Sequence, residues 1–169
     1  MMKNSDKELG VVLHNIRSCE NVGSILRTAD FFGFKFVWFV GVTPYPTIEG
    51  DERLPHIREK LDKQIKKVSL GAESNLILIH EPNLKTLTTK LKDMDWCVVG
   101  LEQNSKSTEL NKFKCKRKKI ALVLGTEVTG LDFDDLTLVD EIVEIPRHGN
   151  KESLNVSVAF GIAASTLSN

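Results

Sequence analysis

The strongest constraint on the fold is a series of short runs made almost entirely of apolar residues. Each has the length of a strand and ends in a polar loop. The runs cover residues 9–13, 34–40, 76–79, 96–101, 120–124 and 142–145. Strands that are apolar along their whole length are typical of parallel sheets covered on both faces. The sequence therefore predicts an α/β domain with a mostly parallel sheet and helices on both faces.

Helical patterns lie between these runs. The spacing of apolar residues predicts a helix from about Val22 to Gly33, and an amphipathic helix over 56–68 after a proline-containing irregular segment at 42–55. Asn83 is expected to cap a helix over 84–91. The last helix is expected to open at Ser153, and its Val, Ala and Gly residues indicate close packing.

The chain is expected to form a single domain over residues 1–169, with no extension domain. With 41% hydrophobic and 27% charged residues it has the composition of a globular protein with a substantial core. We find neither a Gly-x-Gly-x-x-Gly fingerprint nor a Gly-Lys-Ser/Thr phosphate loop, which disfavours an ordinary dinucleotide or nucleoside triphosphate site.

Overall charge makes no case for a nucleic-acid partner, because Lys plus Arg and Asp plus Glu both total 23. Affinity for RNA would need a local patch. The best candidate is the basic run over residues 112–119, which either meets phosphates or forms a solvated loop.

Cysteine and histidine usage limits the setting and the chemistry. The three cysteines form no Cys-x-x-Cys pair and are odd in number, which indicates a reducing compartment, and we expect the cytoplasm. The first eight residues do not resemble a signal peptide, and no apolar run is long enough to span a membrane. The four histidines lack zinc-site spacing, so we expect no metal; His148 is expected on a solvated turn, with substrate contact as the alternative.

Polar residues collect where several strands are expected to end. The loops over residues 15–21, 101–104, 125–130 and 146–153 all follow apolar runs. In open parallel sheets the ligand crevice lies at the carboxyl ends of the strands. We therefore expect a ligand site there, although Ser and Asn before the last helix are also ordinary capping residues.

Three of these junctions together resemble the signature motifs of the SpoU/TrmH family of RNA ribose methyltransferases, within the knotted SPOUT superfamily. Motif one covers residues 21–29 and motif two covers residues 124–131. Motif three is Ile145-Pro146 followed by residues 153–159. The order of the motifs is specific, and the resemblance extends over nearly the whole chain.

The resemblance implies a fold, a cofactor and partners. It implies a C-terminal trefoil knot, S-adenosylmethionine as methyl donor, and methylation of a ribose 2′-hydroxyl in structured tRNA or rRNA. It also implies a homodimer. The alternative is an RNA-binding module that keeps the fold without catalysis; the presence of the whole polar set favours the enzyme.

The resemblance assigns catalytic positions to Arg27, Asn21, Glu127 and Asn155. Arg27 either takes the proton of the ribose hydroxyl or stabilises the alkoxide, and the second role suits a permanently charged guanidinium better. Asn21 either orients Arg27, holds a phosphate or caps its helix. Glu127 either pairs with a cation such as Arg27 or shapes the motif-two turn.

For the cofactor, the resemblance implies contacts from three strand-end loops, at positions Leu101, Gly125, Ile145, Ser153 and Leu154. Gly125 and Gly130 are expected to let the backbone approach the cofactor. One position departs from the family pattern: Arg147 stands where Met is usual after Ile-Pro, and its charge either contacts RNA or alters cofactor packing.

Overall fold

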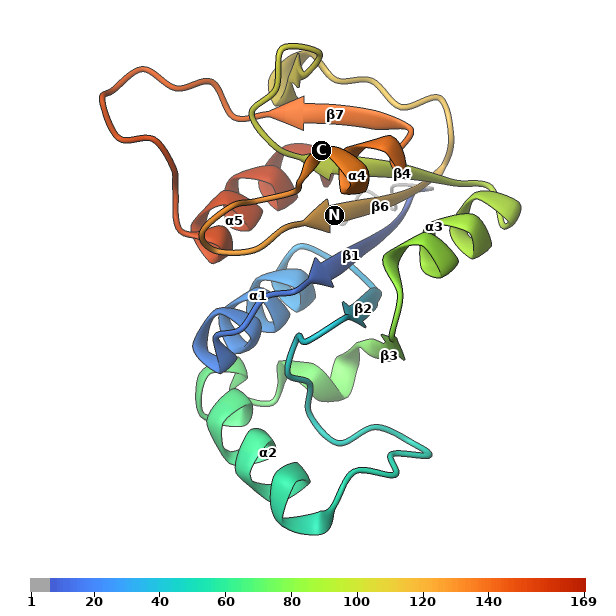
Figure 1. The fold of residues 1–169 in the computed structure, drawn as a ribbon, viewed down its shortest axis with the longest axis vertical. Helices are drawn as coiled ribbons and strands as arrows, with labels where there is room; N and C mark the ends of the chain where they lie inside the picture. Colours follow the sequence, from blue (N-terminus) through green and yellow to red (C-terminus); the bar gives the residue numbers. More distant parts are fainter. Residues whose placement is uncertain (1–6) are drawn as a thin grey trace, which may run out of the picture.

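A computed structural model describes residues 7–169. Residues 1–6, which belong to the segment expected not to be a signal peptide, lie outside this range. Within residues 7–169, seven strands form one sheet in the order β3-β2-β1-β6-β4-β7-β5 (Figure 1). All six neighbouring pairs are parallel. The strands are β1 (Glu8–His14), β2 (Phe36–Val40), β3 (Ile77–Glu81), β4 (Trp96–Leu101), β5 (Thr108–Glu109), β6 (Lys119–Leu124) and β7 (Glu141–Glu144).

Helices cover both faces of this sheet. They are α1 (Cys19–Phe31), α2 (Pro55–Ser69), α3 (Leu84–Asp93), α4 (Phe133–Thr137) and α5 (Val156–Leu167), with 3₁₀ turns η1 (Ala72–Asn75) and η2 (Leu110–Lys112). Val11 and Leu13 of β1 belong to one buried cluster with α1 and α5, whereas Val12 belongs to a second cluster with α3. Because side chains alternate along a strand, these two cores lie on opposite faces. The predicted α/β class is confirmed.

Two local predictions were wrong. The run at 76–79 was expected to be a buried strand, but β3 is a sheet edge and Ile77 is 49% exposed. The last helix begins at Val156, with Asn155 as its N-cap, rather than at Ser153. The Asn155 side chain accepts the Ser157 N–H at 2.8 Å, so the amide rather than the earlier hydroxyl ends the loop.

Helix α4 was not expected at all. It is held by a capping box in which Asp132 and Asp135 each accept the other's backbone N–H. None of its five side chains is completely buried, which explains why no apolar periodicity in the sequence predicted this helix.

Close helix packing positions α2 against α1. A Cβ atom on Gly23 would lie 2.7 Å from the Ile65 carbonyl oxygen, so only glycine allows this approach. On its other side α1 packs against α5, and the two run in the same direction. Asn155 Nδ2 donates to Asn21 Oδ1 near their first turns, and Ser168 Oγ donates to the Phe32 carbonyl near their ends.

None of the helices in residues 7–169 is both long and apolar enough to cross a membrane.

Candidate active site

A cavity of about 310 Å³ opens at the carboxyl ends of β4, β6 and β7. All five residues that the resemblance relates to a cofactor line it: Leu101, Gly125, Ile145, Ser153 and Leu154. They come from the three strand-end loops in which a ligand site was expected. The volume is at the lower end of the range of small-molecule sites.

Motif two forms a closed turn in the wall of this cavity. Thr126 N–H donates to the Gly130 carbonyl and Gly130 N–H donates to the Thr126 carbonyl, both at 3.1 Å. A Cβ atom on Gly125 would lie 2.2 Å from the carbonyl carbon of Gly130, and Gly130 itself has a φ of 66°. The glycines are therefore required first by the chain's own turn.

The cavity is acidic. Four glutamates line it, Glu102, Glu127, Glu144 and Glu152, and none of its described lining residues is Lys, Arg or His. Glu102 accepts the Leu131 N–H at 2.8 Å, and Glu144 accepts the Ser107 hydroxyl at 2.6 Å. Such a site favours a ligand that carries positive charge.

Glu102 was missed as a site residue. The sequence contained a signal that could have identified it, because Glu102 directly follows Leu101 at the end of an apolar run. Its carboxylate lies against motif two, where a Cβ atom on Gly130 would be 1.9 Å from Glu102 Oε2. It therefore links the loop after β4 to the motif-two turn.

Glu127 connects motif two to the first turn of α1. Its carboxylate accepts the backbone N–H groups of Arg17 at 3.1 Å and Ser18 at 3.0 Å, and Asn21 Nδ2 at 3.3 Å. Asn21 Oδ1 in turn accepts Asn155 Nδ2 at 3.1 Å. The chain of contacts from Glu127 through Asn21 to Asn155 joins all three motifs beside the cavity.

The environment of Glu127 favours its ionised form. Burial raises the pKa of the Glu127 carboxyl, but hydrogen bonds from the backbone N–H groups of Ser18, Glu127 and Arg17, and from the Asn21 side chain, outweigh it. The pKa of this carboxyl therefore lies below its ordinary value. A carboxylate here also faces the positive end of the α1 dipole.

Arg27 lies apart from the other three residues of the catalytic set. It is exposed on α1 and does not line the cavity, and its side chain makes no hydrogen bond or ion pair within residues 7–169. Arg27 lies six positions after Asn21 in the helix, roughly 9 Å along its axis. Pairing between Glu127 and Arg27, one of the two expected alternatives, is not formed in this chain.

Capping roles are also resolved. Ser18, not Asn21, caps α1: its hydroxyl oxygen accepts the Asn21 N–H at 3.2 Å. Ser153 caps no helix and is exposed in the cavity wall. Ser153 is thus available to a ligand, whereas the Asn21 amide is already engaged by Glu127 and Asn155.

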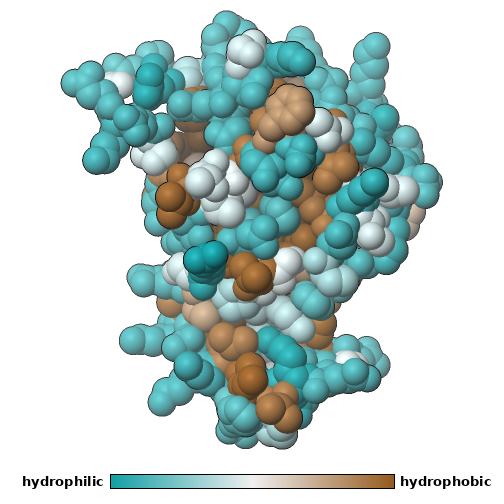
Figure 2. All heavy atoms as spheres, viewed as in Figure 1, coloured by the Kyte–Doolittle hydropathy of each residue, from teal (hydrophilic) through white to brown (hydrophobic). Residues whose placement is uncertain are grey.

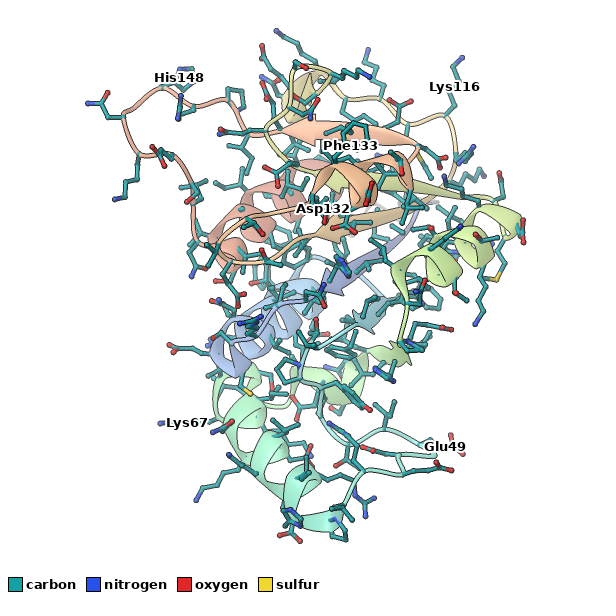
Figure 3. All side chains as sticks on the ribbon, viewed as in Figure 1. Glu49, Lys67, Lys116, Asp132, Phe133 and His148 are labelled. Atoms are coloured by element: carbon teal, nitrogen blue, oxygen red, sulfur yellow. The ribbon has the colours of Figure 1, made fainter. Side chains whose placement is uncertain are left out.

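Arg147 and His148 belong to an exposed loop that extends away from the sheet (Figure 3). Neither lines the cavity. Across residues 7–169, no group of three or more His, Cys, Asp or Glu side chains is arranged to hold a metal ion.

Fold and cavity together define the class of protein: a parallel α/β domain with a ligand site where the strand-end loops meet. Residues 53–165 match the family model described as SpoU rRNA Methylase. The chain therefore belongs to the SpoU methylase family.

Relatives with curated names include enzymes for two kinds of RNA. One is a tRNA (guanosine(18)-2′-O)-methyltransferase of Borreliella burgdorferi, 29% identical over 94% of this chain and 65% of the relative. Another is a 23S rRNA (guanosine-2′-O-)-methyltransferase of Nitrosomonas europaea, 32% identical over 94% of this chain and 55% of the relative. The chain thus spans less than two thirds of the length of these relatives.

Solved structures share the fold. The SpoU methyltransferase AviRb from Streptomyces viridochromogenes, in complex with AdoMet, has a TM-score of 0.78 at 23% identity, covering 96% of this chain and 57% of that one. The TrmH/SpoU tRNA modifying enzyme of A. aeolicus has a TM-score of 0.75 at 21% identity, covering 96% and 74%.

Proposed function

We propose that this protein transfers a methyl group from S-adenosylmethionine to a ribose 2′-hydroxyl of tRNA or rRNA. Family membership and the activities in the names of its relatives support this reaction. The observation that carries the proposal is the acidic cavity whose rim holds the Glu127–Asn21–Asn155 contacts. Because the curated relatives are bacterial enzymes that modify tRNA or rRNA, we propose that the reaction takes place in the cytoplasm.

The lining of the cavity suits the cofactor in charge. Residues from three loops surround it, and its four carboxylates complement a ligand with a sulfonium and an ammonium group. We assign Leu101, Gly125, Ile145, Ser153 and Leu154 to its binding. When bound, S-adenosylmethionine supplies an electrophilic methyl group.

The chain's polar residues would act on the ribose. We propose that Asn21 and Asn155, which already contact each other, orient it, while Glu127 holds the start of α1 in place. Arg27 would stabilise the alkoxide that develops as the hydroxyl gives its proton to water; its oxygen takes the methyl group, and S-adenosylhomocysteine leaves. A guanidinium stays protonated in water, which makes stabilisation the better role.

We further propose a homodimer in which Arg27 serves the cavity of a second copy. Arg27 does not reach its own chain's cavity lining and lies on an outward row of α1 with Phe31, which is 81% exposed. On α5 beside it, Val158 and Ile162 are 51% and 41% exposed. A shared interface would cover these apolar side chains and complete the site.

The trefoil knot is also part of the proposal. Strand β7 lies near one edge of the sheet, whereas α5 packs against α1 and touches η2. Threading of the C-terminal segment through the preceding loops would connect these positions. A crystal structure that traces residues 102–169 tests this path.

Two measurements test the reaction. Calorimetry with S-adenosylhomocysteine should detect binding, and absence of heat at high ligand concentration would remove the methyltransferase assignment. Tritium transfer to total tRNA, total rRNA and a protein fraction then identifies the substrate class. Binding of RNA without transfer would favour the non-catalytic RNA-binding module.

A further inference from the structure

A second cavity lies on the other side of the motif-one loop. It has a volume of about 690 Å³ and lies between α2 and the loops that follow β1 and β2. Its lining residues are Arg17, Cys19, Val42, Pro44, His56, Ile57, Lys60, Leu61 and Gln64. We call this cavity the α2 groove.

The α2 groove has the opposite charge to the cofactor cavity. Arg17 and Lys60 line it together with His56, and none of its described lining residues is Asp or Glu. Lys63 and Lys67 continue the basic row along the exposed side of α2, and neither forms an ion pair within residues 7–169. Figure 3 shows Lys67 directed away from the molecule into solvent. This row suits a polyanion.

Apolar side chains form the rest of the groove. Val42 is 65% exposed and Ile57 is 39% exposed, and both line it with Pro44 and Leu61. Figure 2 shows hydrophobic side chains at the surface over α2, with hydrophilic ones around them. A ligand with a flat apolar part and a negative charge matches this mixture, and an unpaired nucleotide has both.

The groove is built rigidly. Thr43, 2% exposed, accepts the Ile16 N–H at 3.1 Å and donates to the Leu13 carbonyl at 2.8 Å, which fastens the loop after β2 to the loop after β1. Asn15 Oδ1 accepts the Val42 N–H at 3.1 Å. The backbones of Arg17 and Val42 are therefore held in place before any ligand arrives.

One residue joins the two cavities. Arg17 lines the α2 groove, and its backbone N–H donates to Glu127, which lines the cofactor cavity. An RNA strand whose ribose lies at Asn21 can therefore extend into the groove over a short path.

We propose that the α2 groove binds an unpaired nucleotide of the substrate RNA that neighbours the methylated one. Arg17 and Lys60 contact its phosphates, and Val42, Pro44 and Ile57 pack against its base. The identification of the bound polymer as substrate RNA rests on the proposed function. The basic and apolar character of the groove is independent of that function.

The test reverses the charge of the row. In Lys60→Glu/Lys63→Glu we expect the Kd for unfractionated tRNA and for a fluorescein-labelled oligouridylate to rise by about tenfold or more. We also expect the salt dependence of binding to become shallower by about one unit per lost phosphate contact. Fluorescence anisotropy across a salt series measures both, and circular dichroism with S-adenosylhomocysteine affinity checks that fold and cofactor cavity are intact.

Lys85→Glu is the matched control, because Lys85 is an exposed helix lysine on α3, across the sheet, without an ion pair in the described chain. It should leave RNA affinity unchanged. A second variant, Arg17→Gln, removes the side-chain charge while the backbone N–H still reaches Glu127. It should raise KM for RNA more than it lowers kcat.

Unchanged affinity in the double variant, or an equal loss in Lys85→Glu, would overturn the proposal. So would a loss confined to Lys114→Glu/Lys116→Glu, in the basic run far from α2 (Figure 3). A change in sedimentation mass would make the groove an interface between copies instead. If the wild-type protein binds RNA through α2 but transfers no methyl group, the proposed function fails and the proposal for the α2 groove stands. If the double variant is active with a normal KM for RNA, the proposed function stands and the proposal for the groove fails.

Discussion

Glu127 is the residue that holds the three motifs together. Its carboxylate accepts two backbone N–H groups at the start of α1 and the side chain of Asn21. Because its pKa is lowered in the folded protein, this contribution to stability is present above the ordinary carboxyl pKa and is lost as pH falls through the folded value.

We expect Glu127→Gln to lower the free energy of unfolding at pH 7 by about 1 kcal/mol, through loss of charge-assisted bonds at a helix start. The difference from wild type should disappear at acid pH, where the wild-type carboxyl is protonated. Urea unfolding at both pH values measures this, with Glu152→Gln as control because Glu152 lines the same cavity without a hydrogen bond in the described chain. A difference that persists at acid pH would contradict the role of the charge.

A separate prediction for a single residue concerns Arg27. Arg27→Ala should leave S-adenosylhomocysteine affinity nearly unchanged and lower the rate by about a hundredfold or more, the size of a lost transition-state contact. Arg27→Lys should rescue little, since an ammonium cannot reproduce the planar fork. Single-turnover methyl transfer at saturating RNA measures the effect, and near-normal turnover of the Ala variant would sink the catalytic assignment.

At the scale of elements, the segment between β2 and α2 is irregular but tightly held. The Arg53 guanidinium pairs with Asp51 at 2.5 Å and lies 3.5 Å from the centre of the Tyr45 ring, which stacks on His80. Thr47 N–H donates to Asp62 of α2 at 2.7 Å. These contacts keep the wall of the α2 groove in place.

The Asp51–Arg53 pair gives this segment a pH dependence. The hydrogen bond from Arg53 lowers the pKa of Asp51 to about 2, so the stabilisation persists above the ordinary Asp pKa and is lost as pH falls towards 2. Asp51→Asn should cost about 1 kcal/mol at pH 7 and lower Tm by roughly 2 to 4 °C. Calorimetric melting at pH 7 and pH 3 should show the gap narrowing at the lower pH; an equal gap at both would contradict the ion pair.

At the scale of the whole molecule, the proposed site depends on two copies. Ile162→Asp places a charge one turn from Val158 on the exposed face of α5 and should give folded monomers without methyl transfer. Sedimentation and circular dichroism measure this. Met94→Asp, at a comparably exposed apolar residue after α3, should remain dimeric and active; a dimeric Ile162→Asp would exclude this interface.

A mixing experiment tests whether the site is shared. Arg27→Ala and Ser153→Trp should each be inactive, the second because its bulk fills the cofactor cavity. If Arg27 serves the other copy, mixed dimers regain one intact site, and an equal mixture should reach about a quarter of wild-type activity by random pairing. An inactive mixture that contains verified mixed dimers would place Arg27 at its own chain's cavity.

Much of the fold followed from the sequence alone. The unbroken runs at 9–13 and 120–124 predicted central parallel strands, because burial on both faces leaves no polar position in them. The motifs also predicted which loops form the cavity, since carboxyl ends of parallel strands meet at one edge. The exposed edge strand β3 was missed because a short apolar run looks the same at an edge and in the centre.

Only the tertiary structure decided which polar groups meet. Glu127 binds the N–H of Ser18, 109 residues away in the chain, and Arg27 lies apart from both. The α2 groove brings together residues of three segments. Thr43 and Asn15 fasten two of these segments, the loops after β1 and β2, to each other, and no local sequence pattern predicts their partners. The periodicity of apolar residues indicates the face of a helix or strand on which a side chain lies, because this face depends only on residues nearby in the sequence. The pairing of charges and hydrogen bonds depends on how loops far apart in the chain approach each other, and the folded core sets that approach.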